Sequence, residues 1–220
     1  MTTLSPSQFR LSSAFKSASL SATWVRTVGL GLLWLVSVSV GGVMLWNHVQ
    51  TEGRLRTPPI QWPESSDIPR RTGTPMLVLF AHPQCPCTIA TLRELDRLLA
   101  RRTGDVDVVV VFARPAGAGK DWFNSSAWTM ASAIPGVATY IDNDNQETDL
   151  FAALTSGQVC LYSGEGELLF HGGITPGRGH EGDSVGKSAI LSLLSGEAGE
   201  ACSPVYGCPL AAPQILREGV

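Results

Sequence analysis

Two cysteines, Cys85 and Cys87, are separated by a single proline in the stretch HPQCPCT, which follows an apolar run and precedes a helical pattern. A thiolate at the start of a helix is stabilised by unpaired backbone N–H groups, which lower its pKa and make it nucleophilic near neutral pH. Pro86 suits this place, because its missing N–H would have no partner in the first helical turn. The pattern predicts a reactive dithiol in which Cys85 attacks and Cys87 resolves.

A disulfide between Cys85 and Cys87 would close a small ring and depart from relaxed disulfide geometry. Strain of this kind raises the reduction potential, so we expect the pair to be more oxidising or isomerising than a relaxed Cys-x-x-Cys. Two inert, buried thiols are the structural alternative. Burial in apolar surroundings does not explain two cysteines around a proline at a helix start.

A metal site is the second hypothesis for this stretch. His82, Cys85 and Cys87 are soft ligands suited to copper(I) or zinc(II), as in a metallochaperone-like module, and His171 or His180 is the candidate for a further ligand. A single three-residue cluster without a second Cys-x-x-Cys favours redox chemistry, which needs no cofactor.

The other three cysteines are predicted to have different roles. Cys202 and Cys208 are separated by five residues in a segment with Pro204 and Gly207, and a structural disulfide between them is predicted for an oxidising compartment. The alternative is a relay pair that exchanges with Cys85 and Cys87. Cys160 alternates with apolar neighbours in a predicted strand and is expected in the core.

The elements that must position these thiols follow from apolar periodicity. Continuous apolar runs predict buried strands, and apolar residues every three or four positions after Cys87 predict an amphipathic helix that ends near Gly104. The order β-α-β-α-β-α-β-β-α predicts an α/β fold with a mixed sheet and helices on both faces. The remaining predicted elements are strands at 76–80, 106–112, 137–141, 158–162 and 167–171, and helices at 120–133, 146–154 and 184–194.

This order, with the cysteines between the first strand and its helix, resembles the thioredoxin-like superfamily over roughly residues 73–196. The resemblance also rests on VATYIDNDNQETDLFAAL followed by GQVCLYSGEGELLFHGGI. The whole chain resembles membrane-anchored thioredoxin-like proteins of the RedB type, with HPxCPC and a GGITPxRGH-like stretch. The resemblance implies a thiol–disulfide oxidoreductase acting on protein thiols or disulfides.

The chain departs from the family pattern in two places. Aligning Pro86-Cys87 with the family's Pro-Cys puts Gln84 where the first cysteine is expected. The family's cis-proline before the strand at Gln158 is replaced by Thr155-Ser156-Gly157. An inactive thioredoxin-like interaction module is therefore a third hypothesis.

The segment Val28–Trp46 contains nineteen residues without a charge. At about 1.5 Å per residue a helix of this length spans roughly 28 Å, close to the hydrocarbon thickness of a bilayer. No A-x-A-like cleavage site follows it, so a retained anchor is predicted. The slight excess of Lys and Arg before the span and the close cysteine pairs together predict that the following domain is extracytoplasmic, or periplasmic, on the inner membrane.

The predicted organisation is a tail (1–27), a transmembrane helix (28–46), a Pro-rich linker (47–74), a thioredoxin-like domain (75–196) and a cysteine-containing tail (197–220). From residue 54 onward the chain has 13 basic and 18 acidic residues, which argues against nucleic-acid binding. GDSVGKS fails the phosphate-loop pattern by one residue, and the G-x-G-x-x-G match at 177–182 is preceded by a hairpin and Pro176 and not by the start of a βαβ unit, so no nucleotide site is expected. Arg178 and His180 in that loop are candidate polar contacts beside the active edge, although an ordinary flexible loop fits equally.

Overall fold

The computed structural model describes residues 22–210, so the expectations for residues 1–21 and 211–220 lie outside the described part. It separates into one unit up to Leu45 and a second unit from Trp46 onward. Helix α1 (Ala22–Gln50) contains the predicted span 28–46, and residues 22–27, expected as tail, are helical. The helix is long and apolar enough to cross a membrane, as a span or as a signal sequence would be.

The second unit is built on a five-stranded sheet in the order β3-β2-β1-β4-β5. Strands β1 (Met76–Ala81), β2 (Asp107–Arg114) and β3 (Val137–Asn143) are parallel, whereas β4 (Gln158–Tyr162) and β5 (Leu168–Gly172) are antiparallel additions. Every residue of β1 is buried, as expected for a central strand covered on both faces. The predicted mixed sheet and element order are confirmed.

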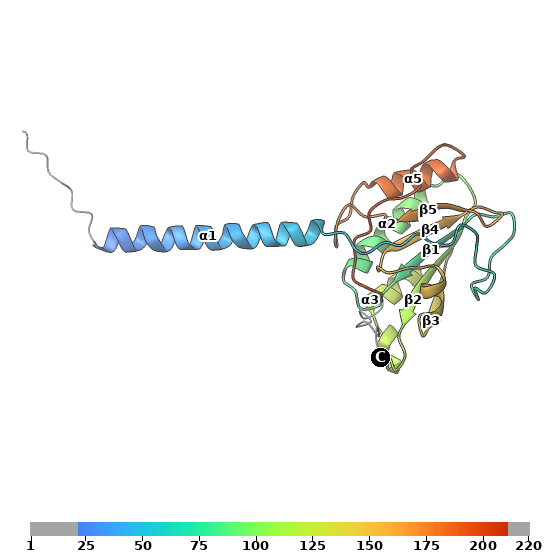
Figure 1. Cartoon of the computed structure of the whole chain (residues 1–220), viewed down its shortest axis with the longest axis horizontal. Coiled ribbons are helices and arrows are strands. Elements are labelled where there is room, and N and C mark those ends of the chain that lie inside the picture. The colour runs from blue at the N-terminus through green and yellow to red at the C-terminus, as the bar shows by residue number, and fades with distance from the viewer. Residues whose placement is uncertain (1–21, 211–220) are drawn as a thin grey trace, which may run out of the picture. The chain divides into compact units, whose positions relative to one another are not determined.

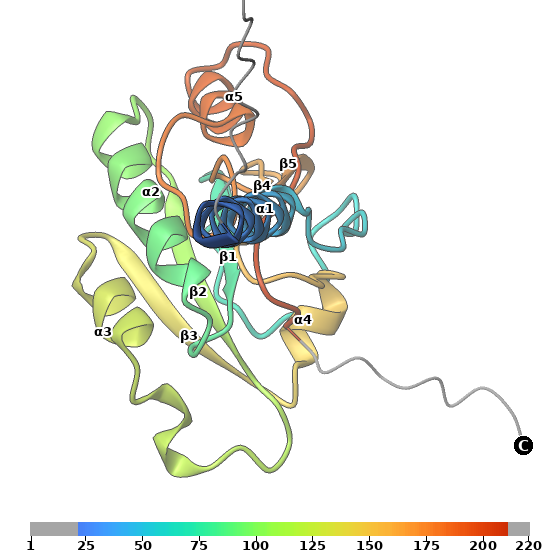
Figure 2. The same cartoon turned by 90° about the vertical axis from the view of Figure 1, so that its left-hand side faces the viewer.

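Helices cover the sheet unequally (Figures 1 and 2). On one face lie α2 (Cys87–Arg101), α3 (Ser126–Ala133) and α5 (Val185–Leu194), which pack on Leu77, Leu79 and Ala81. Among the residues that the structure describes, the helix on the other face is the short α4 (Gln146–Leu150). The core on that face also takes side chains from outside the predicted domain: Ile68, Leu210 and the partly buried Trp62, beside Met76, Val78, Phe80 and Phe151.

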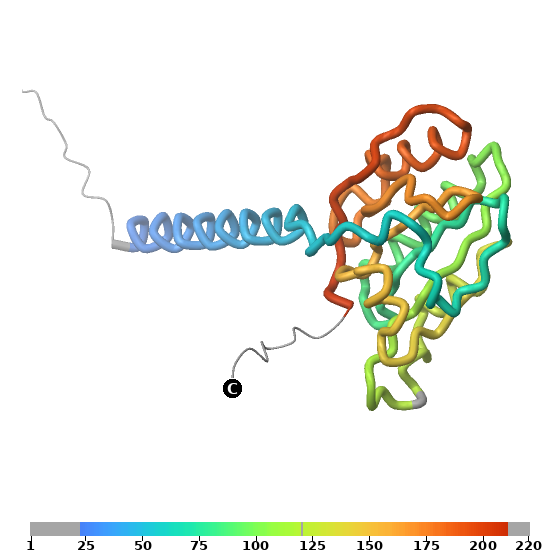
Figure 3. The backbone as a smooth tube through the Cα atoms, turned by 45° about the vertical axis from the view of Figure 1, so that its right-hand side comes forward, coloured from blue at the N-terminus to red at the C-terminus, as the bar shows by residue number. Residues whose placement is uncertain are grey.

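The Pro-rich segment 54–74, expected as an extended spacer, is therefore part of the folded domain (Figure 3). Trp62 donates its backbone N–H to Gly166 O at 2.8 Å, and its ring meets the rings of Phe151 and Tyr162 edge-on at 5.0 and 5.3 Å. Downstream, the N–H of Asp67 and the hydroxyl of Ser66 donate to Glu147 at 2.8 and 2.7 Å. The physical reason is the thin helical cover on this face, which leaves apolar strand surface for the segment to bury.

We expect Ile68→Ala to lower the free energy of unfolding by about 2 kcal/mol, because it truncates a buried isoleucine that is 3% exposed. The matched control is Ile60→Ala, since Ile60 lies in the same segment and is 70% exposed. That control should change stability by less than about 0.5 kcal/mol. Denaturant unfolding of the full-length protein in detergent measures both. Equal effects of the two substitutions would show that the segment is an unpacked spacer.

Two further boundaries differ from the prediction. The helix expected over 120–133 is split into a 3-10 turn, η1 (Lys120–Phe123), and α3, because Ser125 accepts a hydrogen bond from Trp128 N–H and caps a new helix. The segment 197–210 is also part of the domain. Figure 3 shows it, in red, running back along the domain after α5.

Candidate active site

Cys85 lies where strand β1 gives way to helix α2. After Ala81 the chain turns through His82, whose carbonyl accepts the Cys85 N–H at 3.1 Å. The Cys85 carbonyl then accepts the Thr88 N–H at 3.1 Å, which starts the helical turn. Pro86 is the N-cap with helical backbone angles, as its fixed φ favours. The predicted placement of the cysteines at a helix start is confirmed.

Cys85 is paired with a cysteine 123 positions away in the sequence. Its Sγ lies 2.8 Å from the Sγ of Cys208, in the segment that follows α5. Cys85 itself is only 4% exposed. The predicted Cys202–Cys208 disulfide is not present in the structure, in which all five cysteines are free thiols.

The electrostatics around this contact distinguish the two sulfurs. Burial raises the pKa of Cys85, but hydrogen bonds from the thiol and backbone of Cys208 and from the backbone N–H groups of Cys87 and Thr88 outweigh it. The pKa of Cys85 therefore lies below its ordinary value, so that its thiolate is favoured. Burial and the neighbouring Cys85 raise the pKa of Cys208 to about 12, so the thiol form of Cys208 is favoured.

Cys87 is the third thiol of this cluster. Burial and the charge of Cys85 raise the pKa of Cys87, while the Arg178 guanidinium and the backbone N–H of Gly179 act in the opposite direction. Arg178 also opposes the rise at Cys208. The expectation that Arg178 lies beside the active edge is confirmed, whereas His180 Nδ1 faces the Arg178 carbonyl at 2.8 Å.

Main-chain hydrogen bonds explain why Cys208, and not Cys202, reaches Cys85. Cys208 O accepts the Ser156 N–H at 2.8 Å, and Leu210 N–H donates to Leu154 O at 3.0 Å. Gly207 must be glycine, because a Cβ there would stand 1.9 Å from Ser156 O. Cys202 is exposed, and its backbone forms an isolated β-bridge with His171 of β5 instead. The two cysteines are thus tied to different elements at opposite ends of an extended segment.

Ser156 and Gly157 lie directly before β4, at the position where the resemblance predicts the family's cis-proline. The Ser156 hydroxyl accepts the His82 N–H at 2.9 Å and lies 3.0 Å from the Thr88 hydroxyl. Gly157 donates its N–H to Phe80 O at 2.8 Å with a φ of +93°, a region that favours glycine. Together they fix the turn after β1 to the start of β4.

The His82 side chain, a ligand in the metal hypothesis, contacts groups other than the thiols. The His82 ring packs edge-on against Trp122 at 5.1 Å, and its Nδ1 accepts the Gln84 N–H. Burial lowers the pKa of both His82 and His171. Within residues 22–210, no three His, Cys, Asp or Glu side chains are grouped as a metal site. The copper or zinc alternative stays a hypothesis.

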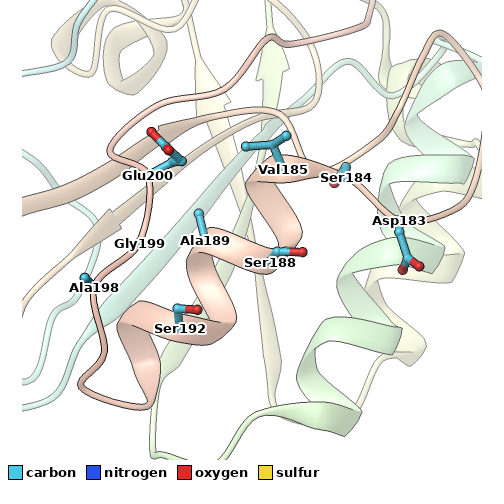
Figure 4. Close-up of a pocket in the computed structure, with 9 residues that line it drawn as sticks. All are labelled: Asp183, Ser184, Val185, Ser188, Ala189, Ser192, Ala198, Gly199 and Glu200. Carbon is cyan, nitrogen blue, oxygen red and sulfur yellow. The ribbon is translucent and has the colours of Figure 1, made fainter.

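A groove of about 300 Å³ runs beside Cys85. Its lining contains no charged side chain: Pro83, Gln84, Cys85, Pro86, Ile89 and residues 125–127. A separate pocket lies between α5 and residues 198–200, with Asp183 and Glu200 among its lining residues (Figure 4). None of the cysteines lines that pocket, whereas Cys85 lines the groove.

Two other expectations concern buried side chains. Cys160 is fully buried in β4, as predicted, and burial raises its pKa to about 12, which makes it inert. Lys187 stands where a phosphate loop would place its lysine, but its Nζ donates to the buried Glu94 at 2.7 Å. Lys187 is therefore the buried counter-ion of Glu94.

No family model and no curated protein matches the chain. Among solved structures, a hypothetical protein from Sinorhizobium meliloti is similar, with a TM-score of 0.56 and 18% identity over 73% of this chain and 97% of that chain. An uncharacterized conserved protein from Geobacillus kaustophilus has a TM-score of 0.52 and 15% identity over 76% and 94%. An exposed lipoprotein thioredoxin from Streptococcus pneumoniae has a TM-score of 0.40 and 17% identity over 57% and 86%. The first two support a shared fold.

Proposed function

We propose that this protein, whose fold is thioredoxin-like, is a membrane-anchored thiol–disulfide oxidoreductase in which Cys85 is the attacking thiolate. The observation that carries the proposal is the contact between Cys85 and a second thiol, Cys208, at 2.8 Å. Thiol–disulfide exchange requires a thiolate to form a mixed disulfide and a second thiol to release it. Cys87 and Cys208 both neighbour Cys85 and supply that second sulfur.

The partners proposed are protein thiols or disulfides. The groove beside Cys85 has no charged lining, and so suits an uncharged stretch of polypeptide around the reacting cysteine. A partner's disulfide would enter along Pro83 and Ile89, which line the groove with Cys85. Helix α1 is proposed as a retained anchor that keeps the domain on the extracytoplasmic, periplasmic side, where oxidising conditions suit thiol exchange.

The test is an exchange assay with the full-length protein in detergent and a disulfide-linked model protein as substrate. We expect the protein, with a dithiol reductant present, to accelerate reduction of that substrate over the reductant alone. Copper and zinc are measured on the reduced protein in parallel. Stoichiometric metal that is lost in a Cys87→Ser variant, together with no acceleration, would favour the metallochaperone-like alternative and contradict the proposal.

A further inference from the structure

We propose that Cys208, and not Cys87, is the resolving thiol, so that the oxidised protein carries a Cys85–Cys208 disulfide that ties the segment after α5 to the start of α2. This inference rests on the proposed thiol–disulfide exchange at Cys85. It differs from the sequence-based assignment, in which Cys85 and Cys87 form the reactive pair.

The first argument is the position of the sulfurs. Cys85 Sγ and Cys208 Sγ are 2.8 Å apart, and a disulfide bond is about 2.05 Å long. A shift of the sulfurs by less than about 1 Å therefore completes the bond. The two sulfurs are thus in contact before the bond forms.

The second argument is the backbone around Cys87. The bonds from Thr88 N–H to Cys85 O and from Ile89 N–H to Pro86 O form the turn that enters α2, so that Cys85 lies just before the helix and Cys87 is its first residue. Cys85 and Cys87 lie within reach of each other, but a disulfide across one intervening residue closes a small ring and departs from relaxed disulfide geometry. A Cys85–Cys87 disulfide would thus strain the start of α2, whereas a Cys85–Cys208 bond joins two separate segments.

The third argument is the way Cys208 is held. Its carbonyl accepts the Ser156 N–H, and the next residues pair with the chain before β4 through the Thr155–Pro209 bridge. Arg178 Nη1 donates to the Gly207 carbonyl at 2.5 Å and fixes the segment from the other side. A preorganised thiol at this site acts at a high effective concentration.

Atoms and electrons balance in an exchange between Cys85, Cys208 and the partner's disulfide. The Cys85 thiolate attacks one sulfur of the partner's disulfide, forming a mixed disulfide and releasing the first partner thiolate. The Cys208 sulfur then attacks Cys85 Sγ, closes the Cys85–Cys208 bond and expels the second partner thiolate, which takes the Cys208 proton. Two electrons pass from the protein's sulfurs to the partner, and an external dithiol returns them by reducing the new disulfide.

The charge of Cys85 influences when Cys208 can react. In the resting state the Cys85 thiolate is one of the groups that raise the pKa of Cys208, and this keeps Cys208 protonated. When Cys85 becomes part of a mixed disulfide, that negative charge is gone, so the pKa of Cys208 falls. The first step of the exchange therefore removes part of what keeps Cys208 protonated, while burial remains the largest cause of its raised pKa.

The test uses the reduced full-length protein, treated with oxidised glutathione, blocked with N-ethylmaleimide and mapped by non-reducing mass spectrometry. Cleavage after Tyr206 separates Cys202 from Cys208, and fragmentation distinguishes Cys85 from Cys87. We expect a Cys85–Cys208 cross-link in the wild-type protein and in Cys87→Ser. In Cys208→Ser, the glutathione adduct on Cys85 should accumulate at least about tenfold over wild type, because the intramolecular thiol is gone.

Cys202→Ser is the matched control, since this exposed cysteine lies in the same segment, and its adduct level should stay within about twofold of wild type. A Cys85–Cys87 cross-link in the wild type, or adduct accumulation in Cys87→Ser and not in Cys208→Ser, would overturn the inference while leaving exchange at Cys85 intact. If neither a glutathione adduct nor a cross-link forms at Cys85 in any variant, that result would instead contradict the proposed function.

Discussion

Replacing Cys85 with serine should reduce the rate of disulfide exchange by about 10³-fold or more, because a hydroxyl at this position cannot form a mixed disulfide. The neighbouring thiols are poorer nucleophiles, because burial is the largest cause that raises the pKa of Cys87 and of Cys208, and this burial persists when Cys85 is replaced. The measurement is turnover of a disulfide-linked model protein by wild type and variant.

Cys202→Ser is the control for this loss, because it removes a thiol that does not contact Cys85 in the described structure. Its turnover should remain within about twofold of wild type. If Cys85→Ser kept a tenth or more of the activity, the attacking thiol would have to be another cysteine.

The second large effect concerns stability. Lys187→Met should lower the free energy of unfolding by about 2–3 kcal/mol, because the buried carboxylate of Glu94 loses its charged hydrogen-bond partner Lys187 and keeps only Arg97 and the Gly182 N–H. Lys187 Nζ donates to Glu94 at 2.7 Å and to the Gly182 carbonyl at 2.8 Å. These bonds join α2, α5 and the loop that carries Arg178, so thiol reactivity should fall together with stability.

Asp183→Asn is the matched control, because the Asp183 side chain also contacts Lys187, at 3.1 Å, but is exposed. A surface ion pair of this kind contributes less than about 1 kcal/mol. Denaturant unfolding compares the two variants. A loss for Lys187→Met no larger than that for Asp183→Asn would show that the buried pair does not stabilise the domain.

The same pair has a pH dependence with a defined sign. Burial raises the pKa of Glu94, but hydrogen bonds from Lys187, the Gly182 N–H and Arg97 outweigh it, so the folded-state pKa lies below the usual value. Its contribution is therefore fully present above the pKa of an unfolded glutamate, about 4.3, and is lost as the pH falls through the lower folded value. Lys187→Met should flatten this part of the stability profile.

The sequence predicted the frame of the site well, because its signals are local. Cys85 and Pro86 could be placed at a helix start from the apolar run before them and the periodicity after them. The parallel pairing of the first three strands followed from alternating strands and helices, since such strands pair in parallel.

The partner of Cys85 could not be predicted in this way. Cys202 and Cys208 are close in sequence, and spacing alone suggested that they pair with each other. Cysteine connectivity depends on where the fold carries each segment, which no local pattern encodes. The one local hint was Gly207, whose missing side chain lets the segment approach Ser156 closely. The role of Ile68 was missed for a similar reason, because a proline-rich segment has no periodicity to reveal a buried side.

The central claim is that Cys85 is an activated thiolate, and its alkylation rate as a function of pH tests this most directly. The reduced full-length protein is treated with iodoacetamide from pH 5 to 10, and modification of Cys85 is followed by mass spectrometry, with the denatured protein as reference. We predict a midpoint for folded Cys85 below that of an unperturbed cysteine, about 8.5. A midpoint at or above that of the denatured protein would contradict the account.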